Sequence, residues 1–158
     1  MNDLFLGMSG NIWAILGAAT AFIIAGLGSC IGMGKAGQAG AGVIAEEPGR
    51  FGSIMVLQAT NCTQAIYGFV VAFFIMGKVI SGNAISIEDG LMLFAAAVPT
   101  GVVGLVSAIY QGHITVAGMH MIAKRGEAMG RALTLILMAE MFAIIALIVS
   151  ILIIGKVG

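Results

Sequence analysis

The run Leu135-Ile-Leu-Met-Ala-Glu140-Met-Phe-Ala-Ile-Ile145 decides the fold of this chain, because it sets one carboxylate in the middle of an apolar segment. The other six acidic residues lie at the N-terminus or in the connections between apolar segments. An apolar segment of about 20 residues spans a bilayer as a helix, and a carboxylate near the bilayer midplane costs about 3 kcal/mol on insertion scales. Glu140 is therefore predicted to be functional, and some group must neutralise it.

The composition of the whole chain agrees with a membrane setting. Its 158 residues are 60% hydrophobic and 9% charged, with a formal net charge of zero. This profile is typical of an integral membrane protein rather than a soluble domain. The balanced charge provides no basic face, so we expect no nucleic-acid partner. No Cys-x-x-Cys or His-Glu-x-x-His spacing supports a zinc site.

Four apolar runs are long enough to cross a bilayer, and only helices suit their length and glycine content. They extend roughly over Asn11–Met33, Phe51–Met76, from Leu91 to beyond Tyr110, and over Met129–Ile154. Polar connections with turn residues separate them: Ala45–Arg50, Ser81–Gly90 and Ala123–Ala128. The sequence therefore predicts an all-α membrane protein with four transmembrane helices.

The two halves of the chain resemble each other. At one constant offset, the matches are Gly26–Ser29 with Gly104–Ser107, Gly34 with Gly112, Gly40 with Gly118, and Ile44–Ala45 with Ile122–Ala123. After the first loop the offset becomes slightly shorter, so Gln64 corresponds to Glu140. The repeat predicts two fused, duplicated hairpins, residues 1–80 and 81–158, with the carboxylate replaced by Gln64 in the first.

Basic residues predict the orientation. The hairpin loops and their flanks carry Lys35, Arg50, Lys124, Arg125 and Arg131, whereas the opposite side carries Lys78 and Lys156. By the positive-inside rule, both hairpin loops face the cytoplasm and both termini face outward.

Several polar side chains are predicted to lie at one depth. Gln111 precedes Gly126 in the second loop by almost the same distance along the chain as Glu140 follows it, so the two can be neighbours across the second hairpin. One face of the second helix carries Thr60, Thr63, Gln64 and Tyr67 at helical spacing. A hard cation prefers oxygen ligands of these kinds, and one carboxylate matches a monovalent ion. The alternative for this set is a hydrogen-bonded cluster that holds the helices together.

Three segments resemble the proteolipid subunits of V-type ATPases, and among them the bacterial sodium-transporting members, whose K subunit forms the membrane rotor ring. These segments are Gln58-Ala-Thr-Asn-Cys-Thr-Gln-Ala-Ile-Tyr-Gly-Phe69, Ser107-Ala-Ile-Tyr-Gln-Gly-His113 and Met138-Ala-Glu-Met-Phe-Ala-Ile144. The resemblance covers essentially the whole chain. Where relatives commonly show Leu-Pro-Gly, this chain has Thr60-Asn61-Cys62.

The resemblance implies a function and a set of ligands. It implies a non-catalytic member of a homo-oligomeric ring in the plasma membrane, carrying Na⁺ on Glu140 during ATP-driven rotation. The partners it implies are a stator membrane subunit, a central-stalk subunit and the surrounding lipid. It assigns the ion to Glu140, Gln64, Thr63, Gln111 and the backbone carbonyl of Thr60, with Tyr67 hydrogen-bonding the carboxylate. Two alternatives remain: the same rotor carrying H⁺, and a passive channel or scaffold without a motor partner.

Overall fold

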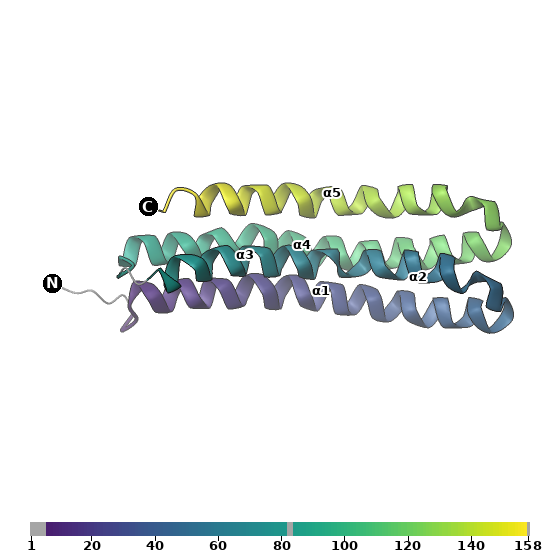
Figure 1. The fold of residues 1–158 in the computed structure, drawn as a ribbon, viewed down its shortest axis with the longest axis horizontal. Coiled ribbons are helices and arrows are strands. Elements are labelled where there is room, and N and C mark those ends of the chain that lie inside the picture. Colours follow the sequence, from purple (N-terminus) through teal and green to yellow (C-terminus); the bar gives the residue numbers. More distant parts are fainter. Residues whose placement is uncertain (1–5, 82–83, 158) are drawn as a thin grey trace.

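The computed structural model describes residues 6–81 and 84–157, and in this part of the chain two helical hairpins lie side by side (Figure 1). The first hairpin consists of α1 (Gly10–Glu46), η1 (Pro48–Arg50), α2 (Phe51–Ala59), η2 (Thr60–Cys62) and α3 (Thr63–Ile80). The second consists of α4 (Ile87–Lys124), η3 (Gly126–Ala128) and α5 (Met129–Ile154). Both hairpin loops lie at one end of the molecule and both chain ends lie at the other.

The four predicted helices are present, but two are longer than the hydropathy indicates. The first continues through the glycine-rich stretch after Met33 as far as Glu46. In this stretch a Cβ at Gly37 would meet Gln58 and one at Gly40 would meet Ile54, so small residues let α2 pack closely on α1. The third begins at Ile87, inside the predicted connection Ser81–Gly90, of which residues 82–83 lie outside the described residues. The Ser86 side chain caps this helix by accepting a hydrogen bond of 3.1 Å from the Asp89 amide.

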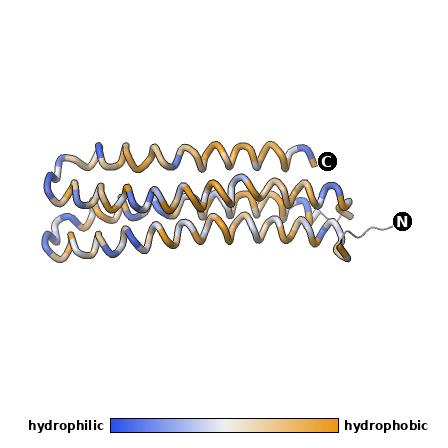
Figure 2. Tube along the Cα trace, turned by 180° about the vertical axis from the view of Figure 1, so that it is seen from behind, coloured by the Kyte–Doolittle hydropathy of each residue, from blue (hydrophilic) through white to orange (hydrophobic). Residues whose placement is uncertain are grey.

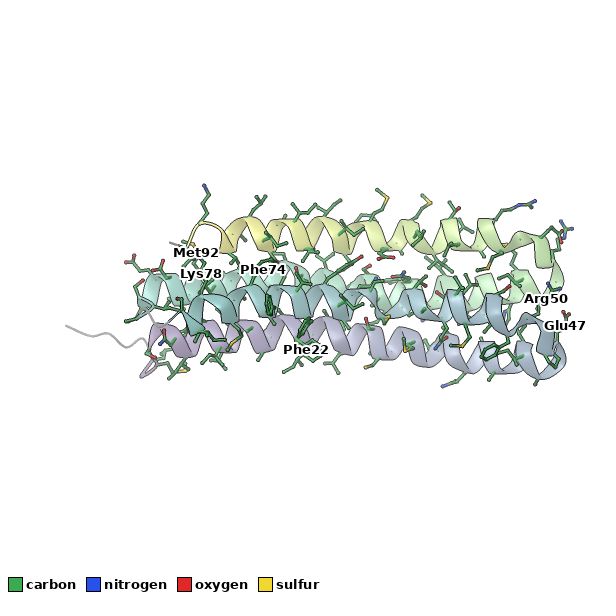
Figure 3. All side chains as sticks on the ribbon, viewed as in Figure 1. Phe22, Glu47, Arg50, Phe74, Lys78 and Met92 are labelled. Carbon is green, nitrogen blue, oxygen red and sulfur yellow. The ribbon has the colours of Figure 1, made fainter. Side chains whose placement is uncertain are left out.

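The outside of the molecule is apolar along most of its length. The segments Gly10–Glu46, Pro48–Ile80, Ile87–Lys124 and Gly126–Ile154 are each long and apolar enough to span a bilayer, so the chain is a multi-pass membrane protein. Hydrophilic residues gather at the hairpin-loop end (Figure 2). Arg50 and Glu47 form an ion pair of 2.8 Å at that end, while Lys78 lies at the opposite end and donates to the Val157 carbonyl (Figure 3).

The helices form two layers. Helices α1 and α4 pack against each other along their length, α3 packs on α1, and α5 packs on α4. One buried apolar cluster, including Val71 and Leu93, lies toward the chain ends. A second, including Leu57, Met119 and Ile136, lies toward the hairpin loops. The polar residues described below lie between these two clusters.

Glycine lets α1 and α4 approach closely. A Cβ atom at Gly28 would lie 2.7 Å from the Cα of Leu105, and one at Gly112 would overlap the backbone of Gly32. Small residues at such contacts permit close backbone packing in lipid, where helix association depends on van der Waals contact. The close contact between α1 and α4 therefore holds the two hairpins together along their length.

This packing makes a prediction about Gly28. Gly28→Leu should lower the free energy of unfolding by about 1–3 kcal/mol or more, because the added side chain meets backbone that cannot move aside. The measurement is the loss of helical circular dichroism as SDS is titrated into the detergent-solubilised protein. Gly77→Leu is the matched control, since nothing lies within 4 Å of a Cβ there. Equal stability of the two variants would contradict the close α1–α4 contact.

A candidate cation site around Glu140

Glu140 lies on α5 with its carboxylate directed into the bundle, and only 7% of the residue is exposed. One carboxylate oxygen, Oε1, accepts a hydrogen bond of 2.5 Å from the Tyr67 hydroxyl on α3. The other, Oε2, accepts a long hydrogen bond of 3.5 Å from Gln111 Nε2 on α4. The carboxylate is therefore enclosed by side chains from two other helices.

Two buried amides connect these helices. Gln64 on α3 and Gln111 on α4 are both fully buried. Gln64 Nε2 donates to Gln111 Oε1 and, at 3.4 Å, to the Ser107 hydroxyl. Gln111 Nε2 in turn donates to the Thr60 carbonyl at 3.3 Å. Because burying unpaired amides is costly, these bonds fix the relative positions of α3 and α4 at this depth.

The membrane-spanning segment after the first loop is not one continuous helix, because it is interrupted at the site. Residues Thr60–Cys62 form a 3₁₀ turn that separates α2 from α3. Asn61 Nδ2 donates to the carbonyls of Leu57 and Gln58 at 3.3 and 3.2 Å. A side chain that bonds nearby carbonyls competes with the helical backbone ladder. Asn61 thus accounts for the interruption without proline, and a 3₁₀ turn within a helix often marks a functional position.

The interruption leaves the Thr60 carbonyl directed toward side chains. It accepts hydrogen bonds from Thr63 Oγ1 at 3.0 Å and from Gln111 Nε2. Thr63 Oγ1 also lies 3.3 Å from Gln64 Oε1. Oxygens that share a hard cation at about 2.4 Å lie about 3.4 Å from one another. The distances from Thr63 Oγ1 to the Thr60 carbonyl and to Gln64 Oε1 are therefore compatible with a shared cation.

Gln111 is the residue whose orientation departs from the predicted ligand set. Its Nε2 atom, rather than its carbonyl oxygen, is directed at Thr60 O and Glu140 Oε2. The reason is electrostatic, since an N–H donor satisfies both a carbonyl and a carboxylate. To offer an oxygen to a cation, the Gln111 amide plane would have to turn over, and Gln64 Nε2 would then keep only its bond to the Ser107 hydroxyl.

The structure brings all six predicted residues together, although their role as ion ligands stays a prediction. These residues are Glu140, Gln64, Gln111, Thr63, Thr60 and Tyr67. Within the described ranges, no group of three or more His, Cys, Asp or Glu residues could hold a metal ion. A cation here would therefore have one carboxylate and otherwise neutral oxygens as ligands. Such a ligand set suits a hard cation and is poor for zinc or copper, which prefer nitrogen and sulfur ligands.

Sequence reasoning missed three buried polar residues that extend the site. Ser107 accepts from Gln64 and donates to the Ala139 carbonyl at 2.7 Å, linking α3, α4 and α5. Asn61 and Thr115 are fully buried, and Asn61 Nδ2 donates to Thr115 Oγ1 at 3.3 Å. The matched pair Ser29 and Ser107 in the internal repeat was the available signal for the first of these. No comparable pattern marked Thr115.

Comparison with known proteins gives one family model and several similar chains. The model, described as that of the ATP synthase C subunit, matches residues 16–75 and again 94–153, in agreement with a duplicated hairpin. The chain is 35% identical over 154 residues to the V-type sodium ATPase subunit K of Enterococcus hirae, covering 98% of this chain and 97% of that protein. It is 41% identical over 143 residues to the A-type ATP synthase subunit K of Methanocaldococcus jannaschii, covering 89% and 61%.

A more distant similarity is also found. The chain is 25% identical over 144 residues to the 16 kDa proteolipid subunit of the V-type proton ATPase of Nephrops norvegicus, covering 91% of each protein. The two family matches fall one in each half of the chain. The boundary between residues 80 and 81 itself stays a prediction.

The Asn61–Thr115 contact can be tested by a double-mutant cycle. Asn61→Leu and Thr115→Val should each destabilise the protein, and their coupling energy should be about 0.5–2 kcal/mol, because each residue bonds the other in a buried membrane setting. The measurement is SDS-induced unfolding of the wild type, both single variants and the double variant. A coupling energy of zero would show that the two side chains act independently.

Proposed function

We propose that this chain, which belongs to the ATP synthase C-subunit family and is part of a membrane rotor ring, carries Na⁺ across the membrane on Glu140 during ATP-driven rotation. The observation that carries the proposal is the buried Glu140 carboxylate, hydrogen-bonded by Tyr67 and Gln111 from neighbouring helices. Sodium is favoured because a full-length relative at 35% identity is named as a sodium ATPase subunit.

The mechanism follows from the charge of Glu140. A bare carboxylate buried at membrane depth is costly, so rotation through lipid requires a bound cation to neutralise it. Thr63 Oγ1, Gln64 Oε1 and the Thr60 carbonyl replace part of the hydration shell that Na⁺ loses on entering the site. Tyr67 holds one carboxylate oxygen in place and leaves the other available to the ion. The positioned oxygens make the neutral, loaded state the one that rotates.

Loading and release require partners. A stator membrane subunit with a basic group would exchange places with the cation at Glu140, and a central-stalk subunit would couple the ring to ATP hydrolysis elsewhere. Transport against a potential of about 100 mV requires about 2.3 kcal/mol for each charge. In this proposal the chain itself is not catalytic, and its work is to bind, neutralise and carry the ion.

The orientation in the cell membrane is part of the proposal. The hairpin loops and their flanks carry five basic residues and the opposite side carries two, which favours cytoplasmic loops and external termini. The structure agrees with this grouping in one respect, because both loops lie at the same end of the molecule. We propose the plasma membrane as its location.

Proton transport is the second candidate, and the proton-ATPase relative at 25% identity favours it. A proton needs only the carboxylate, whereas Na⁺ also needs oxygens around it. The two functions therefore differ in how they depend on Thr63 and Gln64.

Carbodiimide labelling separates the two ions. At fixed pH, Na⁺ should slow the labelling of Glu140, because an ion bound to the carboxylate blocks the attack. Thr63→Val should raise the Na⁺ concentration needed for protection about tenfold, the equivalent of about 1.4 kcal/mol. Labelling without Na⁺ should stay close to that of the wild type, and the control Thr134→Val alters an exposed threonine on α5 that bonds its own helix. Labelling that is indifferent to Na⁺ would favour the proton.

Transport itself is tested with Glu140→Gln. In membranes that contain the whole ATPase, this variant should abolish ATP-driven uptake of radioactive Na⁺, because a neutral amide can neither attract the cation nor exchange it with a basic stator group. Ring assembly, judged by the mass of the purified ring, should be retained. ATP-driven uptake that survives the substitution would point to a passive channel or scaffold.

A further inference from the structure

The contact between α1 and α4 within the chain supplies a template for a contact between copies. Two of the close contacts between these helices are Ala25 against Gly104, where a Cβ would be 3.2 Å from the alanine Cβ, and Gly32 against Gly112. On each helix the two positions are about two turns apart, so both pairs belong to one continuous contact face. The first hairpin uses this face of α1 to receive the second hairpin.

The internal repeat keeps one constant offset in this region, the offset that matches Gly34 with Gly112, so each member of these pairs has an equivalent in the other hairpin. The equivalents of Gly104 and Gly112 are Gly26 and Gly34 on α1. The equivalents of Ala25 and Gly32 are Val103 and Tyr110 on α4. If the second hairpin of one copy receives the first hairpin of the next copy in the same way, Gly26 meets Val103 and Gly34 meets Tyr110.

Two observations show that these positions are open in the single chain. Nothing lies within 4 Å of a Cβ placed at Gly26 or at Gly34, although both glycines lie in the middle of a long membrane-spanning helix. On α4 and α5, an open groove of about 450 Å³ is lined almost entirely by apolar surface. The lining of the groove includes Val103 and Tyr110, the two residues that the repeat selects.

We infer that the groove on α4 and α5 of one copy receives α1 of the next copy, with Tyr110 seated over Gly34 and Val103 over Gly26 of that neighbour. The same register sets Leu27 of the neighbour against Val106, because Leu105 packs at Gly28 inside the chain. Leu27 and Val106 are 55% and 49% exposed in the single chain. Contact between copies therefore buries an exposed leucine in an apolar groove.

The inferred contact differs from its template in one respect. Gly32 has no side chain and lets α1 and α4 approach until their backbones touch. Tyr110, which is 62% exposed, stands at the equivalent position between copies. Its ring occupies space that is empty at Gly32, so α4 must lie farther from the α1 of the next copy than from its own. Around the ring, the distance between α1 and α4 is therefore short within each chain and longer between one chain and the next.

This inference names the surface through which copies meet, and it rests on the ring but not on the ion that the ring carries. The groove is also lined by Ser107, which bonds Gln64 at the cation site. The neighbouring copy therefore covers the side of the site that faces along the ring. Its test must report on contact between copies and not on transport.

Cysteine cross-linking in the assembled ring tests the inferred pair. In a chain whose free cysteines Cys30 and Cys62 are replaced by serine and alanine, Gly34→Cys and Tyr110→Cys are introduced together. A short bifunctional thiosulfonate reagent should join one copy to the next and produce a ladder of multiples of the chain mass on a denaturing gel. Each single variant should give only monomers. The inferred contact sets Gly34 of one copy against Tyr110 of the next copy, and never sets Gly34 against Gly34 or Tyr110 against Tyr110.

The matched control combines Gly34→Cys with Phe73→Cys, which is 66% exposed on α3 and lies outside the inferred contact. This pair should give no ladder. A ladder from Gly34→Cys alone would mean that two copies meet through the same face, and no ladder from the Gly34–Tyr110 pair would mean that they do not meet here. Either result overturns the inference, while Na⁺ protection of Glu140 would be unaffected.

Accessibility labelling distinguishes a neighbouring copy from lipid in the groove. A membrane-permeant maleimide should label Val106→Cys several-fold more slowly in the assembled ring than in dissociated subunits. Labelling of Phe73→Cys should be equal in the two states. Equal labelling of Val106→Cys in ring and subunits would mean that mobile lipid fills the groove, and the inference would be wrong.

Discussion

The cost of holding one carboxylate within apolar surroundings determines the arrangement of the whole molecule. Glu140 is almost completely shielded by its own chain, and its two oxygens accept hydrogen bonds from Tyr67 and Gln111. These donors come from α3 and α4, so the acidic group can be accommodated only where three helices meet. Apolar clusters above and below keep this layer separate from both membrane surfaces. If this layer binds a cation as proposed, it can exchange the ion only where a partner opens it.

The duplicated hairpins have diverged according to their place in the fold. In the first hairpin, the position of the carboxylate is held by the neutral Gln64, whose amide bonds Gln111 and Ser107. In the second, the same position holds the acidic residue Glu140. The glycines of α1 and α4 give the two hairpins a close common contact, and that contact fixes Gln64 and Gln111 at hydrogen-bonding distance. The small residues of the inner helices and the polar residues of the site thus depend on each other.

Much of this arrangement could be predicted from sequence. Four long apolar runs have no other stable form in lipid than helices, and Gln111 and Glu140 are nearly equidistant from their hairpin turn, which predicted their contact. The apolar run ends near Met33 while α1 continues to Glu46, and hydropathy alone does not mark that end, because a glycine-rich stretch disfavours a helix until its packing partner is known. The 3₁₀ turn depends on bonds from Asn61 to carbonyls of the preceding turn. The orientation of the Gln111 amide depends on neighbours from other helices, which no local pattern encodes.

The glutamine at position 64 has a consequence for energy conversion. If Glu140 carries the ion as proposed, a ring of these chains contains one acidic carrier for every four helices, so one revolution moves half the charge moved by a ring of equal helix number with an acid in each hairpin. With a fixed number of ATP molecules consumed per revolution, each transported ion receives twice the free energy. Such a ring sacrifices throughput and can maintain a correspondingly larger electrochemical gradient.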